Sequence, residues 1–201
     1  MQLPEFFDAV PRIAVRDPLA RFLGAAADGV IEYRYADVVK LAGHSCPTVA
    51  SAYLMTRGAL LALYPDALPE RGGIRVELRD ERTAGTTGVV ANVASFLTGA
   101  TQDTGFKGIG GHFDRRGLLS FGVDLPAQLR FTRVDTGASA TASAQLDRIP
   151  PDPRVALLLP KCLHGVASTE ETALFQRLWQ GRVRTLLLDC ADDPDVIVVR
   201  R

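Results

Sequence analysis

Alternation of apolar and polar residues marks the expected strands. Residues 29–35 and 74–79 alternate with the period of two that is typical of a half-buried strand. Further along, three short segments are separated by Gly or Pro, which favour turns, and we expect them to form a meander of successive strands. These segments are residues 118–123, 128–134 and 139–146.

Two longer stretches carry helical signals instead. Residues 47–64 place apolar side chains along a broad helical stripe, and Pro47 suits the first helical position because its missing N–H would be unpaired there. Residues 87–97 are rich in Val and Ala, and Gly99 closes them. A shorter helix is expected over residues 36–41. The pattern predicts an α+β fold in which a mixed or antiparallel sheet packs against two main helices.

The end of the chain follows a proline-rich stretch, residues 149–153, that is typical of a linker. Beyond it, apolar runs flank a helix that opens with a Ser-x-x-Glu capping box, which predicts a C-terminal β-α-β appendage. We therefore expect a core over residues 1–148 and an extension over residues 149–201. Whether the extension is a separate unit or continues the main sheet stays open. Its segments are residues 155–159, 170–180, 184–189 and 197–200.

Composition narrows the class of protein. Lys plus Arg and Asp plus Glu both number 23, so the formal net charge is zero. This balance argues against a nucleic-acid partner, which calls for a basic surface, and it favours self-association. The three cysteines are an odd and sparse set for a disulfide framework. The sequence shows no signal peptide and no long apolar run, so we expect a cytoplasmic protein without a membrane partner.

The main candidate functional residues lie in the sequence Gly43-His44-Ser45-Cys46-Pro47, between two expected helices. His44 and Cys46 are two residues apart in a loop, so both side chains can reach one small object. Cys46 falls in the N-cap region of the next helix, whose partial positive charge favours a thiolate. A thiolate and a neutral imidazole suit zinc and its neighbours. The alternative is structural, with His44 as a helix cap and Cys46 as a small apolar side chain.

Two segments resemble the FmdE family, a group of proteins related to formylmethanofuran dehydrogenase. Residues 42–61 are similar to the opening of that family, a Gly-His-x-Cys-Pro loop followed by a helix of small residues. Residues 89–101, which end in Phe96-Leu97-Thr98-Gly99-Ala100-Thr101, resemble the family's second helix. The resemblance covers residues 36–125. It implies an α+β core, often an intertwined homodimer, with a metal at the His-x-Cys loop.

The chain also departs from this family. The family's cysteines at the two ends of the second helix fall near Val89 and Ala100, and its aspartate falls near Asn92, so these groups are missing. No Cys-x-x-Cys pair occurs, and we therefore expect no zinc-ribbon domain of the kind that some members add. The resemblance consequently transfers a metal-binding role to His44 and Cys46 alone.

A tetrahedral zinc site needs three or four protein ligands, so this pair requires others. His112, in Gly110-Gly111-His112-Phe113-Asp114, is the first choice for a third ligand. Asp103, Cys162 and His164 are further candidates, although an ordinary loop or capping role also fits each of them. We expect zinc as the metal, with nickel or cobalt as alternatives. Cys190 fits a buried strand end.

Three functions are compatible with such a site. The first is a metal-binding homodimer that senses or carries the metal, or uses it to bind a small ligand. The second is a metalloenzyme in which the metal activates water at the His44–Cys46 site. The third is a metal-free thiol enzyme with Cys46 as nucleophile and His44 as base. It ranks last, because residues two apart in one loop rarely form a good nucleophile–base hydrogen bond. Whether the protein is an enzyme stays open.

Overall fold

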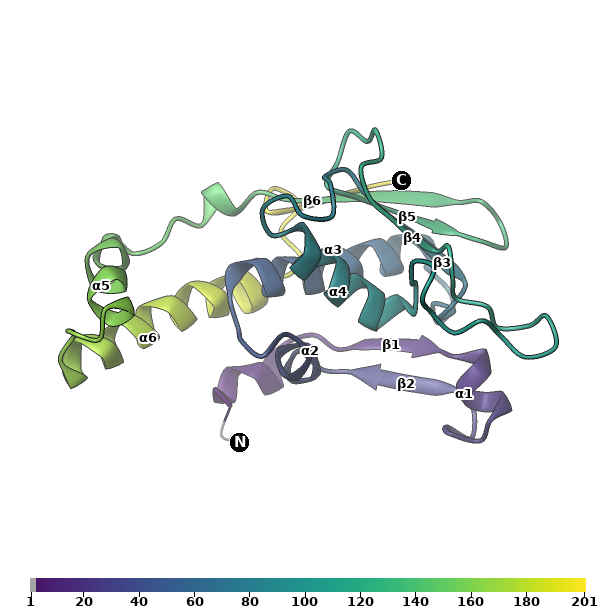
Figure 1. Ribbon diagram of the computed structural model, residues 1–201, viewed down its shortest axis with the longest axis horizontal. Coiled ribbons are helices and arrows are strands. Elements are labelled where there is room, and N and C mark those ends of the chain that lie inside the picture. The colour runs from purple at the N-terminus through teal and green to yellow at the C-terminus, as the bar shows by residue number, and fades with distance from the viewer. Residues whose placement is uncertain (1–2) are drawn as a thin grey trace.

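A computed structural model describes residues 3–201 and shows an α+β fold arranged in layers (Figure 1). Within these residues the main sheet has five strands in the order β4-β3-β5-β6-β7. β3 and β4 are parallel, and the other neighbours are antiparallel, so the predicted mixed sheet is confirmed. The strands are β3 (Ile74–Leu78), β4 (Leu119–Ser120), β5 (Leu129–Arg133), β6 (Ser139–Ala144) and β7 (Ile197–Arg200).

The predicted meander is only partly correct. β5 and β6 are antiparallel neighbours, but β4 pairs with β3, so β3 separates it from β5. The chain returns from the loop after α4 to the free edge of β3, where the Val76 N–H donates to Leu118 O at 2.7 Å. Consecutive strands in the sequence are therefore not neighbours in the sheet here, because β4 pairs with the free edge of β3 and not with β5.

Two helices form the middle layer, as predicted. α3 (Pro47–Leu63) and α4 (Thr87–Thr98) lie between the main sheet and a hairpin of β1 (Ile13–Arg16) and β2 (Val30–Tyr33) (Figure 1). α3 is buried on most sides, as expected for a helix that is apolar nearly all round. The Tyr53 hydroxyl, on α3, donates to Pro11 O at 2.7 Å and ties the hairpin layer to the helices.

The remaining N-terminal elements are short. They are η1 (Glu5–Ala9), α1 (Pro18–Phe22) and α2 (Tyr35–Ala42), and the last of these is the helix expected before the His-x-Cys loop. No helix in residues 3–201 is both long enough and apolar enough to cross a bilayer.

The C-terminal extension is not the predicted β-α-β unit. Residues 155–159 belong to a helix, because the Asp152 side chain accepts from the Arg154 N–H and Pro153 occupies the first turn. Residues 184–189 continue α6 as a π-helical turn instead of forming a strand. β7 pairs with β6, so the extension returns to the main sheet. Its elements are η2 (Leu146–Arg148), α5 (Pro153–Leu163), α6 (Thr169–Arg184), η3 (Thr185–Asp189) and β7.

Candidate metal centre

The His44–Cys46 loop connects two helices whose ends fix its path. α2 ends at Gly43, whose φ of 74° is the left-handed conformation that glycine adopts without strain. Cys46 is the N-cap residue of α3, and its Sγ accepts from the Val49 N–H at 3.5 Å. The loop therefore presents Cys46 Sγ at the positive end of the α3 dipole.

A backbone carbonyl sets the orientation of the His44 ring. Nδ1 lies 2.9 Å from Ala42 O, and since a carbonyl can only accept, Nδ1 carries the proton. Nε2 of the neutral ring is then left with a lone pair, and it lies 3.4 Å from Cys46 Sγ. The structure thus brings together the two predicted ligands and aims the correct nitrogen at the sulfur.

This arrangement fits a shared metal ion. Zinc ligands at 2.0–2.1 Å for nitrogen and 2.3 Å for sulfur, at the tetrahedral angle, are about 3.5 Å apart. The observed Nε2–Sγ separation of 3.4 Å needs almost no adjustment to match that spacing. The bond from Nδ1 to Ala42 O is the outer hydrogen bond that metal-binding histidines usually make.

Ser45, between the two ligands, is anchored on both sides. Its Oγ is 3.0 Å from the Tyr35 hydroxyl, a phenol whose pKa is raised by burial, so it is neutral at physiological pH. Its carbonyl accepts from Trp179 Nε1 and from Gln180 Nε2, both at 3.1 Å. These bonds tie the site to α6, more than a hundred residues away in sequence. The sequence indicates no such role for Trp179, because no local pattern signals the contact.

The structure does not bring His112 to this pair. His112 is exposed and faces Ile109 across a tight hairpin in which each N–H donates to the other's carbonyl, at 2.9 and 3.0 Å. Gly110 and Gly111 have the positive φ values that such a turn requires. The hairpin lies at the end of the molecule opposite α5 and α6 (Figure 1). His112 there lines a pocket of about 200 Å³ with Pro18, Leu19, Glu70, Arg71, Gly72, Phe113, Asp114 and Arg115.

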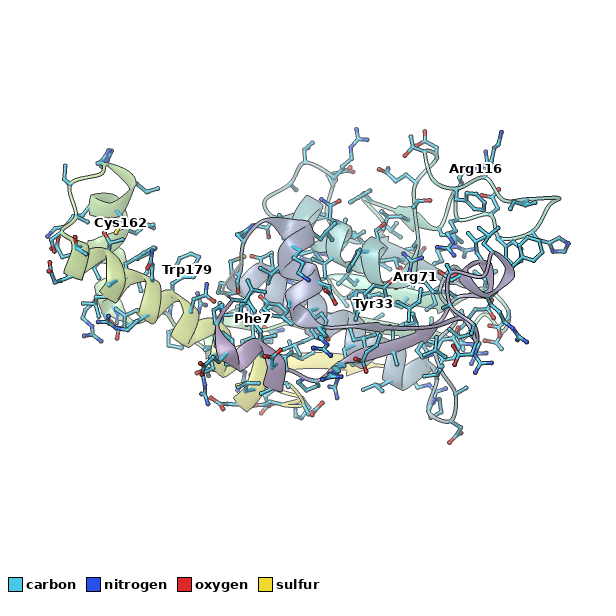
Figure 2. The ribbon with its side chains drawn as sticks, turned by 90° about the horizontal axis from the view of Figure 1, so that it is seen from below. Phe7, Tyr33, Arg71, Arg116, Cys162 and Trp179 are labelled. Atoms are coloured by element: carbon cyan, nitrogen blue, oxygen red, sulfur yellow. The ribbon has the colours of Figure 1, made fainter. Side chains whose placement is uncertain are left out.

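The other candidate ligands are also separate from the pair within one chain. Cys162 and His164 lie at the end of α5, far from the body of the molecule (Figure 2). At 100° per residue they point about 200° apart, so they do not converge on one ion. Asp103 lines an open groove near Asp114 and Arg116. Cys190 is half-buried after η3, and burial raises the pKa of its thiol.

Among residues 3–201, no three His, Cys, Asp or Glu side chains gather closely enough to hold a metal ion together. One chain therefore offers two ligands, His44 and Cys46, with unequal access. Cys46 is 9% exposed, whereas His44 is exposed to solvent. Further ligands to a bound ion would have to come from solvent, from a small molecule or from another chain.

A pocket of about 310 Å³ lies beside the first turn of α3. Thr48, two residues after Cys46, forms part of its wall, and Ser51, Asp80 and Thr87 add polar groups. Its size and mixed lining suit a small polar molecule.

No protein-family model matches this chain, and no curated protein matches it either.

Proposed function

We propose that the protein binds a transition metal ion, preferably zinc, through His44 Nε2 and Cys46 Sγ. The observation that carries this proposal is the 3.4 Å separation of these two atoms, with Nδ1 already bonded to Ala42 O. One imidazole and one thiolate form a borderline-soft pair that also suits nickel and cobalt. With two protein ligands per chain, the remaining positions are open to a small ligand, which is the chemistry of a metal sensor, carrier or ligand-binding protein.

The resemblance to the FmdE family supports the same pair of ligands and a homodimer. The segments that carry it, residues 42–61 and 89–101, form the His-x-Cys loop with α3, and α4 with the turn after it. The pocket beside Thr48 supports a small-molecule ligand near the metal. A bound metal would supply a Lewis acid, while the chain itself orients the imidazole and holds the sulfur at the helix N-terminus.

A second function is favoured by the same contact. Without a metal, the Cys46 thiol can donate its proton to His44 Nε2, and Ala42 O holds the ring in the tautomer that accepts it. That is the nucleophile, base and orienting group of a thiol enzyme. The expectation that residues two apart rarely make this contact does not apply here, because the loop folds the imidazole back onto the sulfur.

Titration of the purified, metal-free protein with cobalt(II) tests the proposal. We expect sulfur-to-cobalt charge-transfer absorption in the near ultraviolet that Cys46→Ser abolishes. His44→Ala should weaken binding by at least about 100-fold, since even the outer hydrogen bonds of metal ligands are worth 10–100-fold. Cys190→Ser and His112→Ala are matched controls and should titrate like the wild type.

The two functions separate in the same preparation. If cobalt, zinc and nickel all fail to bind, metal binding is refuted. Rapid alkylation of Cys46 by iodoacetamide that slows in His44→Ala would then favour the thiol function. A charge-transfer band that persists in Cys46→Ser would also contradict the proposal, because another thiol would be the ligand.

A further inference from the structure

α3 and α4 both begin at the pocket beside Thr48, here called the helix-start pocket. Thr48 and Ser51, in the first two turns of α3, and Thr87, the first residue of α4, line it. Met55 and Leu78, which are buried in the core, add apolar walls. The start of each helix carries a partial positive charge, so two such charges lie at one cavity.

Thr87 brings an unpaired hydroxyl to the helix-start pocket. The residue is 8% exposed, and its Oγ1 has no hydrogen-bond partner among residues 3–201. Oγ1 is not one of the fully covered unpaired atoms in this part of the chain, so the small exposed part of Thr87 includes that oxygen. Because buried hydroxyls are normally hydrogen-bonded, Oγ1 marks a position where a bound molecule completes the bonding.

Gln128 adds a donor whose direction is fixed. Its Oε1 accepts from the Ala144 N–H at 2.9 Å, and its backbone N–H donates to Ser143 Oγ at 3.1 Å. Since Oε1 is held by the sheet, Nε2 is left to donate to a molecule in the pocket that Gln128 lines. The Thr48 N–H, in the first turn of α3, also has no acceptor among residues 3–201. These donors and the two helix starts suit a carboxylate.

The charge of the pocket wall limits the kind of molecule further. Among the described residues that line it, Asp80 is the one ionisable side chain. Its side chain is 48% exposed, which places it at the mouth, and Arg79 Nε donates to Oδ1 at 3.0 Å, which leaves Oδ2 to accept. A phosphate would meet no Lys or Arg in this wall and would face the Asp80 carboxylate. A carboxylate that is accompanied by an ammonium group suits both the helix starts and Asp80.

We propose that the helix-start pocket binds an α-amino acid with an aliphatic side chain. Its carboxylate accepts from the Thr87 hydroxyl and from Gln128 Nε2, and its ammonium group donates to Asp80. Its side chain lies against Met55 and Leu78. The cavity volume of about 310 Å³ is at the lower end of the range for ligand pockets, as expected for so small a molecule.

This inference names the class of small ligand that the proposed function leaves open. Thr48 is two residues from Cys46 in the first turn of α3, so an occupant of the pocket lies near the candidate metal ligands. That link to the metal rests on the proposed function. Binding in the pocket uses neither His44 nor Cys46, so it can be tested on the metal-free protein, and its failure would leave the metal proposal intact.

The first experiment is isothermal titration calorimetry of the metal-free full chain with leucine, valine and methionine. We expect binding of leucine. 4-Methylpentanoate, which lacks the ammonium group, and 3-methylbutylamine, which lacks the carboxylate, should each bind at least about 10-fold more weakly, because each loses a charged hydrogen-bonding group. No binding of any of the three amino acids, or either analogue binding as tightly as leucine, would overturn the inference.

The second experiment locates the two charged ends with variants whose folding is checked by circular dichroism. Thr87→Val removes the hydroxyl at nearly constant shape and should weaken leucine about 10-fold. Thr83→Val, the same substitution at an exposed position outside the pocket, is the control and should bind leucine like the wild type. Wild-type affinity in Thr87→Val would refute the placement of the carboxylate.

The remaining variants distinguish the ammonium end from the carboxylate end. Asp80→Asn, at an exposed site, should weaken leucine but not 4-methylpentanoate. Gln128→Glu keeps an acceptor for the Ala144 N–H and replaces the amide donor by a negative charge, so it should weaken both compounds. If Asp80→Asn leaves leucine affinity unchanged, or weakens both compounds equally, Asp80 does not bind the ammonium group and the inference fails.

Discussion

Asp17 shows how a charge is kept inside this protein. Its carboxylate is 2% exposed and accepts from Arg115 Nη2 at 2.6 Å, Arg71 Nη1 at 3.0 Å and the Ala20 N–H at 3.0 Å. Burial raises the pKa of Asp17, but the hydrogen bonds outweigh it and hold the pKa below its usual value. The cluster joins the start of α1 to the segment before β3 and to the loop after α4.

Replacement of Asp17 by Asn should lower the free energy of unfolding by about 3–5 kcal/mol at neutral pH, because two largely buried guanidinium groups lose their counter-charge. The folded-state pKa is depressed, so the wild type has this stabilisation in full above the unfolded pKa near 3.9 and loses it as the pH falls through the folded pKa. Urea unfolding at several pH values measures the difference between the two proteins.

That difference should be constant above about pH 5 and shrink toward acid. Glu32→Gln is the control, since it removes an exposed ion pair with Arg12 that contributes little. A difference that does not change with pH would mean that the charge of Asp17 is not what stabilises the fold.

At the residue scale, the proximity of two side chains in one loop was predictable, and long-range contacts were not. The spacing of His44 and Cys46 indicated that both side chains could reach one ion, and the structure places their donor atoms 3.4 Å apart. The bonds from Trp179 and Gln180 to Ser45 O link residues that no periodicity relates. His112 was the first choice for a third ligand, but it lies in a separate hairpin, where Gly110 and Gly111 provide the positive φ values of the turn.

At the element scale, α5 is a helix where a short apolar run was interpreted as a strand. Residues 155–159 form a short apolar run, which periodicity alone cannot divide between strand and helix. The sequence did contain a signal that favours a helix over a strand here. Asp152 followed by Pro153 is typical of an N-cap residue with proline in the first helical position. The Ser168–Glu171 capping box, by contrast, predicted the start of α6 correctly.

The helical arm, defined here as residues 153–180 of α5 and α6, should unfold locally when the packing between its two helices is weakened. Leu158 on α5 is 7% exposed, so Leu158→Ala should remove about 2–5 kcal/mol of stability through the cavity it leaves. Because α5 makes its main contacts with α6, we expect the loss in amide-exchange protection of residues 153–180, with α3 unchanged.

Leu61→Ala, the same substitution at an exposed position of α3, should leave exchange unchanged throughout the chain. Equal acceleration of exchange in α3 and in the arm of Leu158→Ala would show that the arm is not an independent unit.

At the scale of the whole molecule, the α+β class followed from two long helical patterns and several alternating segments. Strand order did not follow, because the pairings of β4 with β3 and of β7 with β6 join segments that are distant in sequence. The extension over residues 149–201 completes the main sheet through β7 and anchors the His-x-Cys loop through α6. The position of the candidate metal centre therefore depends on the loop at residues 43–47 and on the contacts that α6 makes with it.

X-ray absorption at the zinc edge of the zinc-loaded protein tests most directly whether His44 and Cys46 share one ion. We predict a sulfur neighbour at about 2.3 Å together with nitrogen neighbours at about 2.0–2.1 Å. Cys46→Ser should lose the sulfur shell, and His44→Ala should lose imidazole scattering. A wild-type spectrum with oxygen and nitrogen neighbours alone, or a sulfur shell that survives in Cys46→Ser, would contradict the shared site.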